Sequence, residues 1–584
     1  MKCGTMSSIS FSENSESQTV IQRSWVFAGI VILGLVLRFF NLGAAPLGES
    51  EAQQAYHVLN PADESFVSPL YMSITSFLFW LFGATNFLAR LLPALMGSAL
   101  IFLPLFFQKE QKDGSALWIA LWLAIDPGLV ATSRQVNTQI LLLTTLLFSL
   151  VFLWNKKYFL GLLFGLFSIF STPFFFHILI PVLLTGFVAT YFWGMDFTPI
   201  RMKDFLKPWI WIVFLVVFLL ISCFMFLPQN LGGWVNFLPQ YLKAWRSSSE
   251  TGYSLFLFGI IGYESALLFM AILGGIRFFK QNTTARVMLT GAGLTLLWVL
   301  VFPGKQVLDL IFVIAPLTYL AGIQLHEMIQ HSLRERRLSL VLGIALLGIF
   351  AYLSQIIFRG FGGENLFLKV LSILIPLLVA MILTLIVMWD SSLSTALHGI
   401  YWALGIFLIL LSTFSLFRIT SVESGKEVWK VPGAIQGERT MLSFVKEVDE
   451  WRKVRSTPLT VAIPAEGYVW KWVFRNYSTV PLGTGLSNGS QPDILVTSSM
   501  VTMDSTVGYR GRVFQAGQIV NWAFLTPSEW LEWIFSRNLP NVVIQKQEVI
   551  LWVRNEILAE GLSGIQSSTS PGAFSTLPKE KQTD

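Results

Sequence analysis

Long apolar segments alternate with short polar ones over the first 418 residues of the chain. Each is about 15–25 residues long, which is the length that an α-helix needs to cross the hydrocarbon core of a bilayer. They lie at 24–41, 88–107, 115–131, 137–154, 158–172, 174–194, 208–227, 254–279, 286–303, 307–327, 338–357, 366–389 and 396–417. The pattern predicts a polytopic α-helical membrane protein with about 13 transmembrane helices.

The stretch 68–83 (SPLYMSITSFLFWLFG) is also apolar, but we interpret it as an amphipathic helix lying in the membrane interface. Counting it as a span would turn the loops rich in Lys and Arg outward, against the positive-inside rule. The first apolar segment could instead belong to a cleaved signal peptide, but the charge pattern is better satisfied if it stays. The sequence thus predicts a cytoplasmic N-terminal tail at 1–23, a transmembrane domain at 24–418 and an outer loop at 42–87.

The pattern changes after Arg418, where short segments typical of a soluble domain replace the long apolar runs. ERTMLSFVKEVDEWRKV has helical spacing, LTVAIP and DILVTSS are short strand candidates, TPSEWLEWIFSR has a Thr-x-x-Glu helix start, and NVVIQKQEVILWVRN alternates like a hairpin. The pattern predicts a small α/β domain at 419–560 on the extracytoplasmic side. The Ser-, Gly- and Pro-rich tail at 561–584 is predicted to be disordered.

Composition supports a multi-pass membrane protein, because 54% of the 584 residues are hydrophobic and only 13% are charged. We expect it to lie in the plasma (cell inner) membrane. The two cysteines, Cys3 and Cys223, lie in a polar tail and an apolar run and predict no disulfide framework. The histidines are scattered without the spacing of metal ligands, so no metal site is predicted from them. The chain has no Gly-rich phosphate-binding loop. Membrane lipids are expected partners, and nucleic acid is not.

Acidic residues follow the first apolar segment in GESEAQQAYHVL, residues 48–59. Ser50 with Gln53 three residues later fits a capping box, which predicts a helix that begins at Glu51. Glu49 and Glu51 would then sit at the positive end of the helix dipole, which favours negative charge. Helix stabilisation alone explains such residues well. The local sequence therefore leaves a functional and a purely structural role open.

The surrounding motifs resemble the GT-C fold glycosyltransferases, the superfamily of protein O-mannosyltransferases and aminoarabinose lipid A transferases. They are Glu51-Ala52, Pro69-Leu70-Tyr71 and Arg90-Leu91-Leu92-Pro93, followed by DPGLVATSRQVNTQILLL. Farther along, YESALLFMAILGGIRFF, FPGKQVLDLIFVIAPLTYLAGIQL and GYVWKWVFRNYSTV look like a flippase-activity-associated subgroup linked to archaeal-type N-glycosylation. The resemblance covers most of residues 24–556.

The resemblance implies a glycosyltransferase that moves a sugar from a polyprenyl-phosphate donor to a lipid, glycan or protein acceptor on the extracytoplasmic face. Such a displacement needs a base for the acceptor's proton and cations for the departing phosphate. Glu49 and Glu51 would supply the catalytic carboxylates. By match to the family, Arg134 and Lys305 are favoured as the cations that bind the donor phosphate, with Arg90 as a further outer-face cation. Either Arg134 or Lys305 could instead be a snorkelling side chain that binds lipid headgroups.

The chain departs from the family at two acids. The family's acidic pair is usually Asp-Glu, whereas this chain has Ser50-Glu51, and a second family acid appears as Gln139. Both changes weaken a divalent-cation site, so a cation cofactor is possible but not predicted. Glu49 could replace the missing base from one residue away. The alternatives are a lipid-linked sugar transporter or flippase-associated factor, and a noncatalytic GT-C relative.

Glu264, a charged residue inside a predicted span, is expected to face a partner or a cavity.

Overall fold

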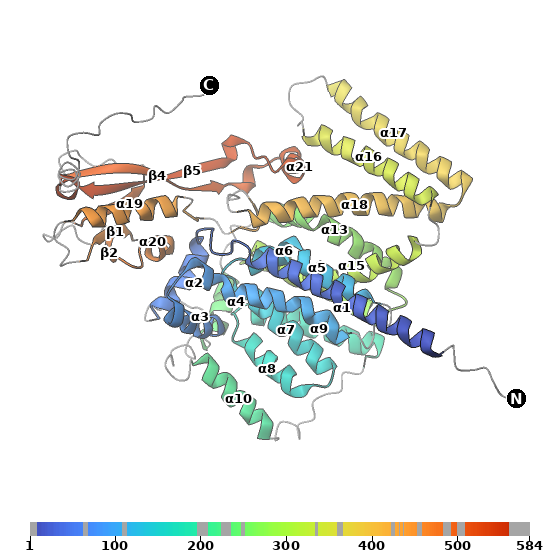
Figure 1. The fold of residues 1–584 in the computed structure, drawn as a ribbon, viewed down its shortest axis with the longest axis horizontal. Helices are drawn as coiled ribbons and strands as arrows, with labels where there is room; N and C mark the ends of the chain where they lie inside the picture. Colours follow the sequence, from blue (N-terminus) through green and yellow to red (C-terminus); the bar gives the residue numbers. More distant parts are fainter. Residues whose placement is uncertain are drawn as a thin grey trace. The chain divides into compact units, whose positions relative to one another are not determined.

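The computed structural model describes residues 9–61, 68–107, 114–195, 208–222, 235–246, 252–332, 337–358, 366–421, 427–430, 433–435, 437–452, 458–465, 467–482, 492–498 and 508–559. They form two compact units, which are described separately (Figure 1). The membrane unit comprises the described parts of residues 1–45, 57–430 and 520–544. The C-terminal unit comprises those of residues 46–56, 431–519 and 545–584, so it includes part of the first predicted outer loop.

Each predicted apolar segment contains a helix of the membrane unit. The helices are α1 (Ile9–Phe39), α4 (Asn86–Ala99) with the 3-10 helix η1 (Leu100–Phe107), α5 (Ser115–Ile125) with α6 (Pro127–Ser133), α7 (Thr138–Trp154), α8 (Tyr158–Ile169), α9 (Phe175–Trp193), α10 (Pro208–Ile221), α13 (Tyr253–Phe278), α14 (Thr283–Val301), η3 (Val307–Leu310) with α15 (Ile311–Ser332), α16 (Leu338–Phe358), α17 (Leu366–Asp390) and α18 (Leu393–Thr420). Shorter helices are α3 (Pro69–Phe82), α12 (Phe237–Ala244) and α21 (Pro527–Ser536).

Eight of the described helices are long and apolar enough to cross a membrane, and α5 with α6 forms one further candidate span that is bent by 54°. The apolar parts of α1, α3, α7, α8 and α10 are shorter. The chain is thus an integral membrane protein. The predicted number of 13 spans and the interfacial position of α3 remain predictions, as do the predicted domain boundaries.

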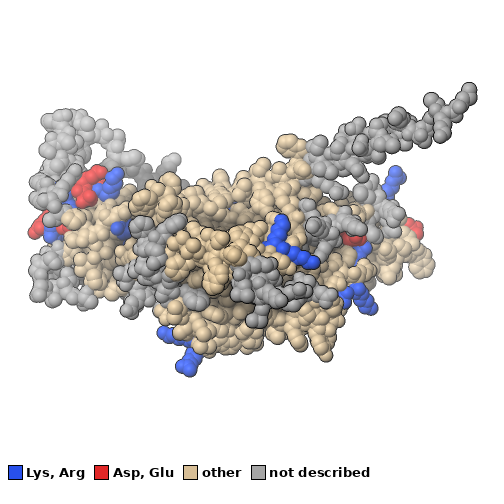
Figure 2. Space-filling model, turned by 90° about the horizontal axis from the view of Figure 1, so that it is seen from below, with Lys and Arg blue, Asp and Glu red and all other residues tan. Residues whose placement is uncertain are grey.

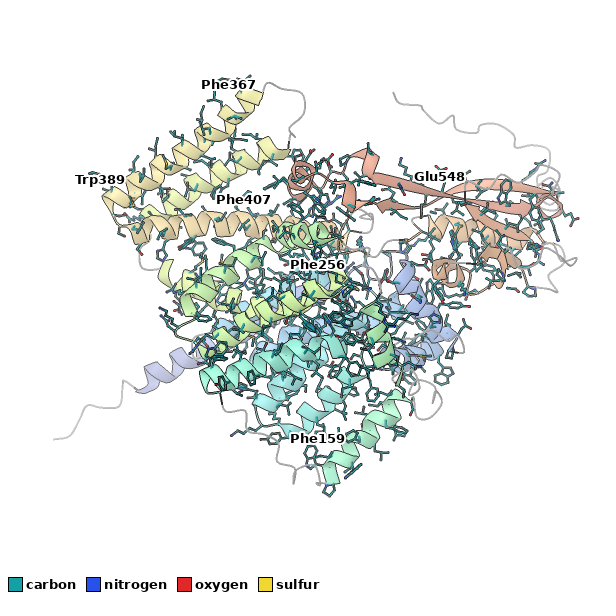
Figure 3. All side chains as sticks on the ribbon, turned by 180° about the vertical axis from the view of Figure 1, so that it is seen from behind. Phe159, Phe256, Phe367, Trp389, Phe407 and Glu548 are labelled. Carbon is teal, nitrogen blue, oxygen red and sulfur yellow. The ribbon has the colours of Figure 1, made fainter. Side chains whose placement is uncertain are left out.

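The surface of the membrane unit is apolar where lipid would contact it. Phe367 and Trp389 of α17 point outward and are 74% and 94% exposed, while Phe256 of α13 is buried among neighbouring helices (Figure 3). On the face shown in Figure 2, Lys, Arg, Asp and Glu side chains cover only small parts of the described surface. Such exposed apolar surface is stable in a bilayer and not in water.

Polar groups inside the membrane unit gather where its helices are bent. Glu264 has non-helical backbone angles inside α13, and its Oε1 accepts a hydrogen bond of 2.9 Å from the Gly128 backbone N–H. Gly128 lies directly after the bend between α5 and α6, where Asp126 caps α6 by accepting from the Leu129 N–H at 2.9 Å. The expectation that Glu264 faces a partner is confirmed. A carboxylate here satisfies a backbone donor that a bent helix leaves open.

The short helix α21 also belongs to the membrane unit. It begins with the predicted Thr-x-x-Glu box, in which Thr526 and Glu529 each accept from the other's backbone N–H. Its last turn is followed by Arg537, which is 2% exposed and donates to the Gly262 carbonyl at 2.8 Å. The buried Glu427 receives an ion pair of 3.7 Å from Arg537 and a hydrogen bond from Tyr263. This network fixes α21 to α13.

The C-terminal unit is built on a five-stranded sheet with the order β2-β1-β3-β5-β4. Its strands are β1 (Thr460–Pro464), β2 (Ser478–Leu482), β3 (Ile494–Ser498), β4 (Tyr509–Val520) and β5 (Ile544–Arg554), with helices α19 (Glu438–Trp451) and α20 (Tyr468–Val473). β1 pairs in parallel with β2 and β3, and β3 pairs antiparallel with β5. The predicted α/β class is confirmed.

One prediction for this unit is wrong. The segment NVVIQKQEVILWVRN forms a single long strand, β5, and not a hairpin. Its Gln and Glu residues lie at exposed positions of that strand, between β3 and β4 in the sheet. The polar stretch that looked like a turn is therefore the solvated part of a continuous strand. The predicted disordered tail at 561–584 lies outside the described residues.

Candidate functional site

The acidic motif forms the first turn of helix α2 (Glu49–Leu59). The helix begins at Glu49, two residues before the predicted start, so Gly48 and not Ser50 precedes its first residue. Glu51 is 2% exposed, and its Oε2 accepts a hydrogen bond of 3.0 Å from the Gly48 N–H. This is the glutamate half of a capping box, moved two residues toward the N-terminus.

Glu49 makes contacts that its position in sequence does not suggest. Its Oε1 accepts a hydrogen bond of 2.5 Å from the Tyr468 N–H, and its Oε2 accepts one of 3.2 Å from the Val469 N–H. These two residues begin α20, so the Glu49 carboxylate caps a helix of the C-terminal unit. The first turn of a helix has free N–H groups that an anion satisfies well.

Arg134 and Arg90 both hold the turn that follows α1. Arg134, which follows α6, donates through Nη1 to the carbonyls of Leu37 at 2.7 Å and Phe40 at 2.9 Å. Burial, and after it the nearby charge of Arg90, lowers the pKa of Arg134 to about 10, so its guanidinium stays charged at neutral pH. Arg90 is 4% exposed and donates through Nη1 to the Ala45 carbonyl at 2.7 Å. Both predicted phosphate ligands therefore also stabilise the end of a helix.

Lys305 lies in the connection between α14 and α15. It is 6% exposed, and its Nζ lies 4.1 Å from the centroid of the Tyr253 ring. A cation over the face of a tyrosine is held by the quadrupole of the ring. Lys305 is thus a positioned and largely dehydrated cation, unlike the exposed lysines of the basic loops such as Lys156 and Lys157.

Gln139 and Asp309 join the loop of Arg134 to the loop of Lys305. Gln139 in the first turn of α7 donates its Nε2–H to Asp309 Oδ1. Asp309 in η3 also accepts from the Gln306 N–H through Oδ2, at 2.8 Å. Asp309 is 1% exposed. The position that carries an acid in the resembling family thus holds an amide here, and a buried acid from the next loop lies against it.

Asp309 and Asp126 were not among the residues predicted for the site. A signal for both was present, because each is an isolated acid within or at the end of a predicted apolar segment. A charge at such a place is costly unless a partner satisfies it. The partners, however, come from distant parts of the chain and could not be read from the sequence.

The carboxylates and the cations lie in different units. Glu49 and Glu51 belong to the C-terminal unit, and Arg90, Arg134 and Lys305 belong to the membrane unit. Among the described residues, no three His, Cys, Asp or Glu side chains lie close enough to hold a metal ion together. Both oxygens of the Glu49 carboxylate accept hydrogen bonds from backbone N–H groups.

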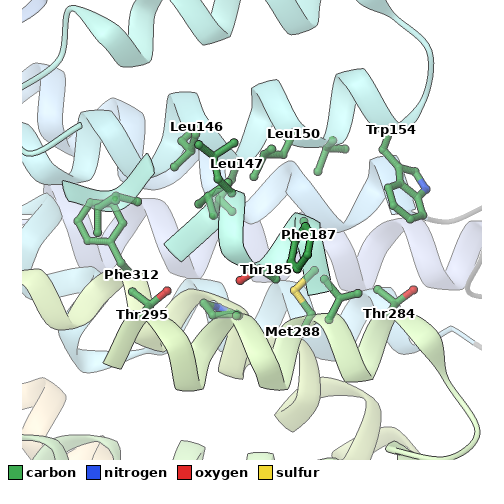
Figure 4. A pocket seen from close by; sticks show the side chains of 18 of the residues that line it. Leu146, Leu147, Leu150, Trp154, Thr185, Phe187, Thr284, Met288, Thr295 and Phe312 are labelled. Carbon is green, nitrogen blue, oxygen red and sulfur yellow. The ribbon is translucent and has the colours of Figure 1, made fainter. Parts of the chain in front are cut away.

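An apolar groove of about 500 Å³ lies within the membrane unit. Helices α7, α9, α14 and α15 line it, and in Figure 4 Leu146, Leu147 and Leu150 of α7 stand opposite Met288 and Thr295 of α14. Two of its threonines donate to backbone carbonyls of α9: the Thr185 hydroxyl to Pro181 at 2.7 Å and the Thr190 hydroxyl to Gly186 at 3.1 Å. The groove therefore suits an apolar occupant.

The groove opens on the apolar surface of the helices. The lining residues Leu183 and Phe187 are 62% and 60% exposed. A side chain placed on Gly186 would meet open space. A long hydrocarbon chain could thus enter from the bilayer.

Comparison with known proteins identifies the fold. No model of a known protein family matches the chain, and no curated protein is similar to it. The chain is similar to the crystal structure of ArnT from Cupriavidus metallidurans bound to undecaprenyl phosphate, with 14% sequence identity and a TM-score of 0.51 over 91% of this chain and 98% of that chain. The apo state of ArnT matches over the same shares, also at 14% identity, with a TM-score of 0.50.

A weaker likeness, with a TM-score of 0.37 and 10% identity, is to the archaeal oligosaccharyltransferase AglB from Archaeoglobus fulgidus in complex with an inhibitory peptide and a dolichol-phosphate. It covers 79% of this chain and 64% of that chain. Both ArnT and AglB are membrane glycosyltransferases of the GT-C fold. The match to ArnT confirms the fold class predicted from the sequence: the chain is a membrane protein of the GT-C fold with a small C-terminal sheet domain.

Proposed function

We propose that the protein transfers a sugar from a polyprenyl-phosphate donor to an acceptor on the extracytoplasmic side of the membrane. The donor is an amphiphile with a long apolar chain and one charged phosphate. The observation that carries the proposal is the arrangement of the groove and the two cation loops in the membrane unit.

The cation loops adjoin the helices that line the groove. Arg134 precedes α7, and Lys305 lies between α14 and α15. The hydrogen bond from Gln139 to Asp309 brings the two loops together. Leu143, one helical turn after Gln139, and Phe312, one turn after Asp309, line the groove. A polyprenyl chain in the groove would therefore have Arg134 and Lys305 near one end of it to neutralise its phosphate.

Transfer would proceed by direct displacement at the anomeric carbon. The acceptor oxygen forms a bond to that carbon, the bond from the carbon to the phosphate oxygen breaks, and polyprenyl phosphate leaves with the electron pair. Arg134 and Lys305, with Arg90, would stabilise the negative charge that develops on the leaving group. The acceptor's proton would pass to a carboxylate.

Glu51 is our first candidate for that carboxylate and Glu49 the second. Glu49 is placed second because both of its carboxylate oxygens accept hydrogen bonds from backbone N–H groups, which fix the carboxylate against α20.

The second candidate is a noncatalytic relative that binds a lipid-linked sugar without transferring it. Ser50 in place of the family's Asp, together with the bound state of Glu49, favours this alternative. It keeps the groove and the cations but gives the carboxylates only a structural role. The two candidates differ in turnover and agree in donor binding.

The experiment that tests the proposal is incubation of the purified protein with a panel of labelled polyprenyl-phosphate sugars, scored for transfer or hydrolysis. Glu51→Gln keeps size and hydrogen-bonding capacity but removes the base, so we expect turnover to fall roughly 100- to 10,000-fold. Glu447→Gln, at an exposed glutamate on α19, is the matched control. Binding of a donor with no turnover of any sugar in the panel would favour the noncatalytic alternative.

A further inference from the structure

The hydrogen bonds of Glu49 connect the acidic helix α2 to α20 within the C-terminal unit. They join residues that are 419 and 420 positions apart in the sequence. The Tyr468 and Val469 N–H groups lie in the first turn of α20, where no intrahelical acceptor exists. The carboxylate thus satisfies two donors that would otherwise need water or another acceptor.

A second contact between α2 and α20 is made by side chains. The Lys471 Nζ lies 4.8 Å from the centroid of the Tyr468 ring and 5.5 Å from that of Tyr56, which is on α2. The two tyrosine rings are 6.2 Å apart. Helix α2 is therefore fixed to α20 at both its first residue and its second turn.

The backbone at Gly467 makes the first contact possible. Gly467 precedes α20 and has a φ of +111°, which residues with a side chain rarely adopt. A Cβ on Gly467 would also lie 3.2 Å from the Trp470 ring. Only glycine lets the chain turn here so that the N–H groups of Tyr468 and Val469 both point at Glu49.

We propose that Glu49 is a positioning residue, and that the C-terminal unit takes part in the reaction by holding α2, and with it Glu51, through this contact. Each oxygen of Glu49 is occupied by one backbone donor, which is the arrangement of a fixed link. Glu51 lies two residues later on the same helix and is buried. The part of this inference that concerns turnover rests on the proposed function.

Two substitutions separate a positioning role from a role as base. Glu49→Gln keeps one acceptor but sets an amide NH₂ against the other backbone N–H. Gly467→Ala leaves the Glu49 carboxylate intact and disturbs the backbone that meets it. A positioning role predicts that both variants behave alike, whereas a role as base predicts a loss only in Glu49→Gln.

Hydrogen exchange of the Tyr468 and Val469 amides in the full-length protein reads the contact directly and needs no substrate. We expect exchange to rise roughly tenfold or more in both variants, because a charge-assisted hydrogen bond is lost. Glu447→Gln, in the same unit, should leave exchange at these amides unchanged. Unchanged exchange in Glu49→Gln would show that the contact does not hold the two helices together and would overturn the proposal.

Turnover is then measured in the same variants. We expect kcat to fall in both Glu49→Gln and Gly467→Ala while the KM for the donor stays within about twofold, because the donor-binding cations lie in the other unit. A loss of kcat in Glu49→Gln alone would mean that Glu49 takes part in the chemistry and would overturn the positioning role. If the wild type transfers no sugar, the proposed function fails, and the exchange experiment still decides whether the link exists.

Discussion

At the scale of single residues, the two predicted phosphate-binding cations differ in what else they do. Arg134 donates to carbonyls at the end of α1, so its side chain helps to hold the fold. Lys305 instead lies in the connection between α14 and α15, with its ammonium over the face of the Tyr253 ring. The two residues should therefore respond differently to substitution.

We expect Lys305→Met to weaken the binding of polyprenyl phosphate roughly 10- to 100-fold, the equivalent of losing one hydrogen bond to a charged group. Thermal stability should change little, because Met fills the same volume. Binding of the labelled lipid to purified protein measures the first effect and a melting curve the second. Lys280→Met, at an exposed lysine, is the control. Equal donor affinity in wild type and Lys305→Met would return Lys305 to the role of a lipid-headgroup contact.

Arg134→Met should lower the donor affinity and also the free energy of unfolding. We expect the loss of unfolding free energy to be about 1–3 kcal/mol, because the carbonyls of Leu37 and Phe40 lose a charged donor. Denaturation of the detergent-solubilised variant measures this loss beside Lys305→Met. If both variants melted at the wild-type temperature, the contacts of Arg134 with the turn after α1 would contribute nothing to stability.

At the scale of elements, the same helices of the membrane unit provide an apolar groove and, at their ends, charged and polar side chains. Helices α7, α14 and α15 line the groove, and Arg134, Gln139, Lys305 and Asp309 lie at or beside their ends. Gly186 of α9 lines the groove, and a Cβ placed there would meet no described atom within 4 Å, so a larger side chain has room to enter the groove.

Gly186→Phe should fill part of the groove and weaken the binding of long polyprenyl phosphates more than that of a short-chain analogue. If two CH₂ groups of the bound chain are no longer buried, the affinity should fall roughly tenfold or more. The matched control is Gly293→Phe, because Gly293 on α14 also has open space around its Cβ position but does not line the groove. A loss that was equal for long and short chains would place the chain outside the groove.

At the scale of the whole molecule, the distribution of basic loops predicts which parts of the chain share a side of the membrane. The first outer loop and the sheet of the C-terminal unit are expected on the extracytoplasmic side, and the loop after α13 in the cytoplasm. The C-terminal unit combines residues 46–56 with residues of the sheet domain, which agrees with that topology.

Cysteine labelling in intact cells tests this topology, after Cys3 and Cys223 are replaced by Ser. A membrane-impermeant maleimide should mark Asn60→Cys and Ser443→Cys at once, and Gln281→Cys only after the membrane is opened; all three positions are exposed. Labelling of Gln281→Cys in sealed cells, or of only one of the other two, would contradict the predicted threading.

The sequence by itself determined the elements of this protein. Apolar length fixed the membrane helices, because a segment such as 338–357 can satisfy its backbone in lipid only as a helix. Local signals fixed the ends of some elements, as the Thr526–Glu529 box did for α21. Motif resemblance gave the GT-C fold that the ArnT match confirms.

Tertiary structure alone decided the partners of the polar side chains. Glu49 meets the first turn of α20, and Gln139 meets Asp309 from 170 residues away. Such pairs leave no periodic pattern, because each depends on where two distant backbones come together and leave a donor or acceptor open. The same reason explains β5, which has a polar stretch typical of a turn but is held as one strand by the neighbours β3 and β4. Chain chemistry sets which groups must find a partner, and the packing of distant elements decides which partner they find.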